Sequence, residues 1–233
     1  MRFLITATAI LSTACGSPDV AGSHSHDGAS ANAGSDQPTA GPEVLPWSAD
    51  YDPPLVLDTA RVHLEPLAPE HVELDFEALM GSREHLQRTL GWGDWPRVDF
   101  TLEENLADLE RHWQEFVDRE GYAYTVLSPD RSRCLGCVYL VPLPGTADDV
   151  AALAFWVIEP ELATDLDRHL LESLTRWFDE QWSFRRVVLA ENENNVRGRE
   201  LAGELGFEPS DSEFEALARM RPDNALQVWT RAE

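Results

Sequence analysis

Three strand-type segments follow one another in the middle of the chain: YAYTVL (122–127), CLGCVYLV (134–141) and VAALAFWVI (150–158). Turn residues at 128–130 and 142–145 separate them, which predicts an antiparallel meander. The next segment, DLDRHLLESLTRWFDEQ (165–181), has apolar residues at helical spacing, so one face of a helix is predicted to cover the sheet. A short buried-type strand, RVVLA (186–190), follows this helix.

Outward from this region, the segment types continue to alternate. Thr101 and Glu104 form a capping-box pattern at the start of a strong helix, and Gly206 stops a short one. The remaining expected elements are a strand at 61–67, helices at 69–80, 82–90 and 196–205, a loop at 92–96, and a closing hairpin at 213–220 and 226–230. Residues 55–233 are therefore interpreted as one α/β domain.

The first fifteen residues, MRFLITATAILSTAC, have the pattern of a secretory signal. Arg2 precedes an apolar run that is too short to span a bilayer as a mature helix. The end of the segment resembles a bacterial lipobox, which implies that Cys15 becomes a lipidated N-terminus. We therefore expect a lipid-anchored protein of the bacterial cell envelope, with a cytoplasmic protein as the alternative if the signal is spurious.

Residues 16–54 are rich in Gly, Ser, Ala, Asp and Pro without hydrophobic periodicity, which predicts a disordered tether. His24, His26 and Asp27 are candidate weak metal ligands there, but polar filler is the simpler interpretation, and no metal site is predicted. The chain has 18 Lys+Arg and 42 Asp+Glu, a formal net charge of −24. This charge argues against nucleic acid as a partner and leaves the lipid anchor as the expected membrane contact.

The order of segments resembles the GNAT superfamily of acetyl-CoA-dependent N-acetyltransferases over residues 58–231. It is most similar to the branch that acetylates protein N-termini, ribosomal proteins and aminoglycosides. The resemblance implies an α/β (α+β) fold with a mixed, mostly antiparallel sheet flanked by helices. The phrases that carry it are RVHLEPL (61–67), WP (95–96) before TLEE (101–104), LGCVYL (135–140), FWV (155–157), and Asn195 followed by Gly206 and Phe207.

In this family the diphosphate of the cofactor lies at the N-terminus of the central helix, in a loop of the form Gln/Arg-x-x-Gly-x-Gly/Ala. Backbone N–H groups and the positive helix end attract the anion there. The resemblance places Leu162 at the basic or amide position, Asp165 at the first glycine and Asp167 at the second small residue. Thr164 is expected to cap the helix. The two carboxylates are expected to repel a diphosphate, with Arg168 as the only cation nearby.

The resemblance also implies a set of site residues. The usual catalytic groups are missing, since Ala202 stands where relatives often have a tyrosine and Gly198 where they often have a serine. Glu191 and Glu193 are candidate general bases that would take a proton from an ammonium group through water, with a solvated loop as the alternative. Acetyl-CoA is the expected co-substrate if the protein is active, and otherwise none is expected. The implied cofactor-binding residues are Phe155, Trp156, Val157, Thr164, Arg168 and Asn195.

Cys134 and Cys137 form a Cys-x-x-Cys pattern. Residues three apart on a regular strand face opposite sides of a sheet, and no second pair completes a zinc site. We therefore expect buried free thiols, with a disulfide and redox or metal chemistry as alternatives. Trp113 is predicted to lie in the core because of its helical spacing, whereas Trp92 and Trp95, in a loop, are either core or cleft residues.

Two functions are compatible with these patterns. The first is an N-acetyltransferase that moves an acetyl group from acetyl-CoA to a primary amine of a protein N-terminus or a small molecule. The alternative is a non-catalytic GNAT-fold binding module of an envelope lipoprotein with a degenerate CoA loop. The acidic loop and the export signal favour the alternative, and the net charge by itself suggests only a cationic partner.

Overall fold

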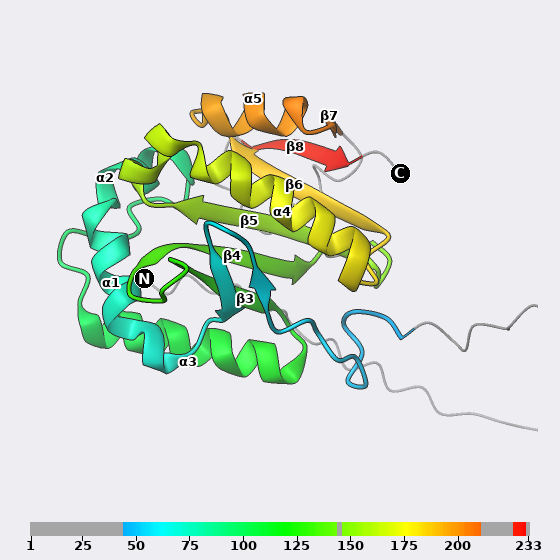
Figure 1. Ribbon diagram of the computed structural model, residues 1–233, viewed down its shortest axis with the longest axis horizontal. Helices are drawn as coiled ribbons and strands as arrows, with labels where there is room; N and C mark the ends of the chain where they lie inside the picture. Colours follow the sequence, from blue (N-terminus) through cyan, green and yellow to red (C-terminus); the bar gives the residue numbers. More distant parts are fainter. Residues whose placement is uncertain (1–43, 144–145, 211–225, 232–233) are drawn as a thin grey trace, which may run out of the picture. The chain divides into compact units, whose positions relative to one another are not determined.

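The computed structural model describes residues 44–143, 146–210 and 226–231. The strands described there form one sheet in the order β1-β2-β3-β4-β5-β6-β8-β7 (Figure 1). The strands are Leu57–Asp58 (β1), His63–Pro66 (β2), Tyr122–Leu127 (β3), Cys134–Pro142 (β4), Val150–Val157 (β5), Arg186–Asn192 (β6), Phe207–Pro209 (β7) and Leu226–Arg231 (β8). The helices are Val72–Gly81 (α1), Arg83–Thr89 (α2), Leu102–Asp118 (α3), Leu166–Gln181 (α4) and Val196–Glu204 (α5), with 3-10 turns at Pro69–His71 (η1) and Glu159–Thr164 (η2).

The pairing of the strands confirms the predicted mixed, mostly antiparallel sheet. β3, β4 and β5 form the predicted antiparallel meander, and only β5 and β6 run parallel among the described pairs. α4 connects these two parallel strands, as a parallel pair requires a long crossover. β8 lies between β6 and β7 and pairs antiparallel with both. The predicted hairpin partner at 213–220 lies outside the described residues.

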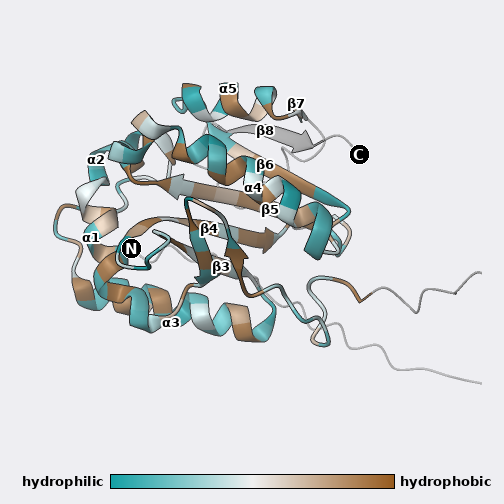
Figure 2. Ribbon diagram, viewed as in Figure 1, coloured by the Kyte–Doolittle hydropathy of each residue, from teal (hydrophilic) through white to brown (hydrophobic). Residues whose placement is uncertain are grey.

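The helices cover the sheet through their apolar faces. α1 and α3 contact β4 and β3, while α4 contacts β5. Figure 1 shows α4 lying across β5 and β6, and α5 beside β8. Figure 2 shows mostly hydrophobic colouring on the central strands and mixed colouring along α3 and α4, as expected for helices with one solvated face. None of the helices in the described ranges combines the length and the apolar character needed to cross a membrane.

α3 illustrates which local signals held and which did not. Thr101 Oγ1 accepts a hydrogen bond from Glu104 N (3.2 Å), and Glu104 Oε2 accepts one from Thr101 N (2.9 Å), so the predicted capping box is confirmed. Phe116 is buried, but the prediction for Trp113 is wrong, because its side chain is 41% exposed and stacks on Phe116 at the rim. The apolar face of α3 is wider than the part of the helix that packs on the sheet, so Trp113 at its edge stays exposed.

The domain begins earlier than residue 55. Trp47 stacks on Tyr122 with ring centroids 5.1 Å apart, and Tyr122 Oη donates a hydrogen bond to Pro46 O (2.5 Å). Tyr51 is buried in the same aromatic cluster. The described end of the predicted tether, residues 44–54, therefore packs on the domain. The signal peptide, Cys15 and the His24 and His26 pair lie outside the described residues.

Cys134 and Cys137 lie on the same face of β4, contrary to the prediction from regular strand geometry. Val126 pairs with Gly136 while the next residue, Leu127, pairs with Cys134, so Leu135 is an extra, bulged residue. A bulge of one residue reverses the alternation of side chains along a strand. Both cysteines are buried free thiols, as predicted.

Candidate functional site

The most distinctive feature of the sheet is the point where β5 and β6 separate. Their ladder ends at the pair Leu153 and Leu189. Beyond it, among the described strands, the rest of β5 pairs only with β4, and the rest of β6 pairs only with β8. The backbone of β5 residues 154–157 therefore faces a gap rather than a neighbouring strand. Such a free strand edge can hydrogen-bond an extended ligand that contains amide groups.

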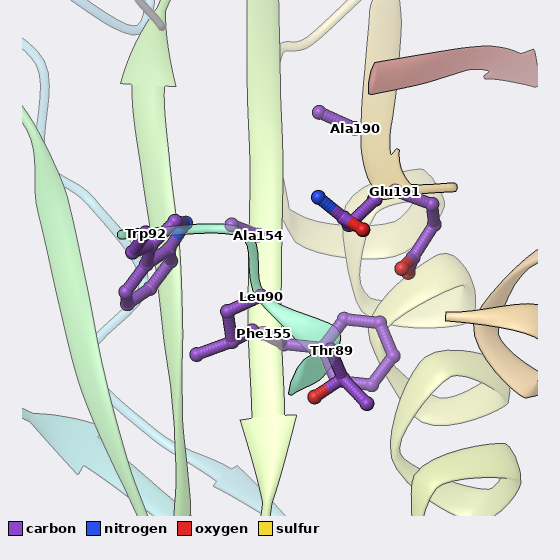
Figure 3. Close-up of a pocket in the computed structure, with 8 residues that line it drawn as sticks. Thr89, Leu90, Trp92, Ala154, Phe155, Ala190 and Glu191 are labelled. Carbon is purple, nitrogen blue, oxygen red and sulfur yellow. The ribbon is translucent and has the colours of Figure 1, made fainter. Parts of the chain in front are cut away.

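A small open recess, with a cavity volume of about 10 Å³ that corresponds to roughly one water molecule, occupies this gap. Figure 3 shows Ala154 and Phe155 on the β5 side, Ala190 and Glu191 on the β6 side, and the end of α2 across the opening. The lining residues are Thr89, Leu90, Trp92, Ala154, Phe155, Ala190, Glu191 and Asn192. Two walls of the recess are apolar, and the β6 wall is polar.

The loop after α2 is pressed closely against the end of β6. Gly91 has a φ of +65°, and a Cβ there would lie 2.1 Å from Asn192 Nδ2. The backbone conformation therefore favours glycine at this position, and any side chain there would also displace the Asn192 amide. At the other end of α2, Ser82 Oγ accepts a hydrogen bond from Glu159 N (3.0 Å). These contacts tie α2 to both sides of the recess.

Glu191 is the ionisable group of the recess wall. Its side chain is buried, and Oε2 accepts a hydrogen bond of 2.6 Å from Asn195 Nδ2. Asn195 Oδ1 in turn accepts from Gly198 N (3.1 Å) and caps α5. A Cβ at residue 198 would lie 2.6 Å from Glu191 Oε2, so the absence of a side chain at Gly198 makes room for the carboxylate. Glu191 is thus held by the first turn of α5.

The N-terminus of α4 carries the predicted carboxylates. Asp165 adopts a left-handed backbone conformation with φ +55°, the kind of position where glycine is favoured. Asp167 follows in the first helical turn and is buried. Carboxylates at this end interact favourably with the helix dipole. The chain's own side chains therefore occupy the part of α4 where an anionic ligand would otherwise be attracted.

Arg197 of α5 neutralises both carboxylates. Its Nη2 donates to Asp165 Oδ1 (2.8 Å), and its Nε and Nη2 bind Asp167 Oδ2 (2.5 Å) and Oδ1 (2.7 Å). Its hydrogen bonds hold the pKa of Asp165 below the ordinary value and raise the pKa of Arg197 itself. The expectation that Arg168 is the only cation nearby is therefore wrong.

Thr164 does not cap α4 as predicted. The N-cap residue is Asp165, and no side chain makes a cap hydrogen bond. Thr164 Oγ1 instead donates to Glu161 O (2.9 Å) and accepts from Arg61 Nη2 (2.8 Å). Arg168 is paired with Glu204 of α5. The left-handed turn at Asp165 displaces the threonine from the capping position.

The structure separates the sequence-predicted site residues into three groups. Phe155 and Glu191 line the recess, and Asn195 contacts Glu191. Thr164 and Arg168 lie around the start of α4, and Glu193 is exposed on the loop after β6. The side chains of Trp156 and Val157 belong to the hydrophobic core.

Several residues of the site were not predicted. Thr89, Leu90 and Asn192 line the recess, and Arg197 joins α5 to α4. Asn192 could have been predicted as a site residue, because it follows the candidate base Glu191 at the end of the same strand. Nothing local in the sequence marks Arg197, because its partners lie 30 and 32 residues away.

A comparison with protein families agrees with this arrangement. The family model of the acetyltransferase (GNAT) domain matches residues 61–208, which include α4, β6, α5 and the whole recess lining. The chain belongs to the GNAT acetyltransferase family. The predicted family resemblance is confirmed, whereas the comparison does not address the N-terminal signal. A comparison with curated protein sequences found no significant match to this chain.

Solved structures of GNAT acetyltransferases share the fold at low sequence identity. The α-N-acetyltransferase of ribosomal protein L7/L12, solved with coenzyme A, has a TM-score of 0.61 and 14% identity over 76% of this chain and 97% of its own. The Salmonella typhimurium acetyltransferase that modifies the N-terminal serine of L7/L12 gives 0.59 and 14% over 75% and 96%. The microcin C7 self-immunity acetyltransferase, solved with acetyl-CoA and AMP, gives 0.60 and 10% over 75% and 94%.

Proposed function

We propose that this protein transfers an acetyl group from acetyl-CoA to a primary amine in the recess between β5 and β6. The acceptor is the amine of a protein N-terminus or of a small molecule. The observation that carries the proposal is the end of the β5–β6 ladder at Leu153 and Leu189, with a recess directly beyond it. Family membership and the named activities of the similar structures support the same reaction class.

Glu191 is the proposed general base. An amine is a nucleophile only without its extra proton, and a carboxylate in the recess can accept that proton directly or through one water. Asn195 fixes the position of the carboxylate by donating to Oε2, and the small residue Gly198 keeps the space beside it open. Glu193, two residues further along the chain, is the same type of acid on the exposed loop and lacks these contacts, which makes it a matched comparison.

The free edge of β5 suits acetyl-CoA better than the start of α4 does. The free edge of β5 at residues 154–157 would hold the amide-containing arm, and the thioester, whose activated acetyl group is the chemistry that the cofactor supplies, would lie at the open mouth of the recess. The start of α4 is less suited to the diphosphate, because Asp165 and Asp167 already occupy the positive helix end. Arg197 and Arg61 are the cations of this end. We therefore expect acetyl-CoA to bind, but weakly.

The acidic start of α4 is also the one observation that favours the second candidate, a non-catalytic binding module. The comparisons give this alternative no support, since the similar structures carry acetyltransferase names. The two candidates differ in one measurable property, the ability to bind and consume acetyl-CoA.

The test is titration of the full-length chain with acetyl-CoA by calorimetry, followed by an assay of thiol release with a panel of primary amines. Glu191→Gln is expected to lower kcat by about 10²–10⁴-fold, the usual contribution of a general base, and Glu193→Gln is expected to leave kcat unchanged. Saturable binding with turnover supports the proposal. No heat at millimolar acetyl-CoA would reject it in favour of the binding module, and equal rates in both variants would reject the role of Glu191.

A further inference from the structure

A second cluster of reactive side chains lies away from the recess. Asp75 of α1 and the two cysteines of β4, Cys134 and Cys137, place one carboxylate oxygen and two sulfur atoms within 4.8 Å of one another. All three side chains are buried, with exposures of 2%, 5% and 0%. The proposed acetyl transfer uses none of them.

The backbone is shaped so that these groups meet. Without the extra residue Leu135, Cys134 and Cys137 would face opposite sides of the sheet. The bulge brings both sulfur atoms to the face that α1 covers, where Cys137 Sγ donates to Asp75 Oδ1 (3.3 Å). Bulges are often found where a strand must redirect a side chain for function.

Asp75 has no positively charged group among its hydrogen-bond partners in the described part of the chain. These partners are the Cys137 thiol and the Asn105 amide, whose Nδ2 donates to Asp75 Oδ2 (2.9 Å). A buried carboxylate is costly unless it is protonated, paired with a cation or bound to a metal. The cluster therefore combines a buried carboxylate with uncharged hydrogen-bond donors, while His71 and His112 interact with that carboxylate electrostatically.

We propose that Asp75, Cys134 and Cys137 bind a thiophilic divalent metal ion, of which Zn²⁺ is the simplest example. Two ligand atoms of one tetrahedral Zn²⁺ lie about 3.5–3.8 Å apart, given Zn–S distances of about 2.3 Å and Zn–O distances of about 2.0–2.2 Å. The cluster thus needs to contract by about 1 Å at most. Two thiolates with one carboxylate select Zn²⁺ over Mg²⁺ or Ca²⁺, which prefer sites made of oxygen ligands.

The groups around the cluster are those that a metal site requires. Asn105 also donates to Val72 O (3.3 Å), so the amide that orients the carboxylate is itself fixed on α1. Tyr139 lies two residues beyond Cys137 on the same face, and its hydroxyl interacts with Cys137 and accepts from Trp156 Nε1 (3.4 Å). Such partners of the ligands hold them in orientation and strengthen metal binding.

Binding exchanges protons for the metal. Burial raises the pKa of Cys137 and of Asp75. When the ion enters, each thiol, and the carboxyl group where it carries a proton, releases that proton to solvent, and two Zn–S bonds and one Zn–O bond form. No oxidation or reduction occurs, and the product is a site with one net negative charge that neutral donors surround.

A metal ion at this place would join α1 to β4 behind the recess. α1 continues into α2, whose last residues Thr89 and Leu90 form the recess wall. Tyr139, beside the cluster, also contacts Trp92 of that wall, with ring centroids 5.8 Å apart. The proposed role of the ion is therefore to hold the helical wall of the recess against the sheet.

The experiment uses the full-length chain, purified under reducing conditions without chelators. We expect one Zn²⁺ per chain by elemental analysis. After exchange for Co²⁺, we expect the near-ultraviolet charge-transfer absorption that cobalt shows only with thiolate ligands. Asn105→Leu is expected to weaken metal affinity by about 10–100-fold, and Cys134→Ser or Cys137→Ser by more than that. Cys15→Ser, which removes the only other cysteine, is expected to change nothing.

The wild-type protein alone decides the proposal if a variant does not fold. Absence of both stoichiometric Zn²⁺ and the cobalt band overturns it, and so does a metal-free protein in which Cys134 and Cys137 form a disulfide. A metal affinity that stays at the wild-type value in both Cys134→Ser and Cys137→Ser, or a band that disappears only with Cys15→Ser, also overturns it. None of these outcomes depends on acetyl-CoA, so they leave the proposed acetyl transfer untouched.

Discussion

The N-termini of α4 and α5 lie next to each other and are built in opposite ways. α5 begins at Asn195, a neutral residue whose side chain caps the helix and whose amide also reaches Glu191 in the recess. α4 begins at Asp165, which makes no cap hydrogen bond, and is followed by the buried acid Asp167. One helix start thus holds Glu191 in the wall of the recess, while the positive end of the other is occupied by the carboxylates of its own residues.

The difference shows that the two ends are coupled rather than independent. Arg197, two residues after Asn195, is the cation that binds both acids of α4. A positive side chain in the first turn of α5 is unfavourable for the dipole of that helix, and the ion pairs with α4 offset this cost. The start of α5 therefore holds the proposed base through Asn195. Through Arg197 it also holds the two carboxylates that occupy the N-terminus of α4, where an anionic ligand would otherwise bind.

The largest effect is expected from a substitution that removes the contact between Asn195 and Glu191 and keeps the cap of α5. Asn195→Asp keeps an oxygen that accepts from Gly198 N, so the cap remains, but it replaces the donor to Glu191 Oε2 by a second carboxylate that repels the first. The lost hydrogen bond to a charged group is worth about 1.5–3 kcal/mol, so we expect kcat/KM to fall about 10–100-fold, and the repulsion is expected to lower Tm as well.

Asn195→Ala provides the matched control, because it removes the cap as well. We expect a similar loss of kcat/KM, with an additional decrease of about 1 kcal/mol in the free energy of unfolding, measured with urea. If Asn195→Asp keeps full activity, Asn195 does not position the base, and the start of α5 has no role in the recess.

The second change opens the start of α4. Asp165→Gly combined with Asp167→Asn removes both acids, and glycine suits the left-handed turn at residue 165. Each carboxylate at a helix start is worth about 0.3–1 kcal/mol, so the acetyl-CoA Kd should fall about three- to thirtyfold by calorimetry. Arg197 is then free to face the diphosphate.

Glu110→Gln, which removes an exposed acid of α3, tests whether the gain is only an effect of net charge. An equal gain in this control, or no gain in the double variant, would show that the acids of α4 do not govern cofactor affinity.

The fold was largely predictable because its signals are local. The three strands that precede α4 could be identified from turn residues, and the start of α3 from Thr101 and Glu104. The family resemblance then placed the phrase from Phe155 to Val157 at the end of the strand that precedes α4. In the site, Glu191 was proposed because the family resemblance places it at the end of a strand where the sheets of relatives splay, and its role stays a prediction.

The features that were missed depend on contacts between distant residues or on strand register. Arg197 meets Asp167 only after α4 and α5 have packed together, and no spacing rule links the two. The bulge at Leu135 changes the facing of Cys134 without any change of composition. Residues 44–54 look like a linker, yet Trp47 finds an aromatic surface on Tyr122 that lies 75 residues further along the chain.

The smallest expected effect comes from removing the cation that joins the two helix starts. Arg197→Gln leaves Asp167, whose side chain is 8% exposed, without its ion-pair partner, but Arg197 itself is 45% exposed. We therefore expect a loss of about 1 kcal/mol in the free energy of unfolding, near the upper end for solvent-exposed pairs. Arg168→Gln, which breaks the exposed pair with Glu204, is the control and should change stability very little.

The pH dependence of the same variant tests the cause of the loss. Arg197 keeps the pKa of Asp165 below its ordinary value, so the stabilisation is present above the unfolded pKa of about 3.9 and is lost as pH falls through the lower folded value. Without Arg197 the folded pKa moves back toward the unfolded one, and this contribution disappears at neutral pH as well. Urea unfolding between pH 3 and pH 7 should therefore show a smaller difference between wild type and variant at the acidic end. A difference that does not change with pH would mean that packing of the Arg197 side chain, rather than its charge, holds α5 against α4.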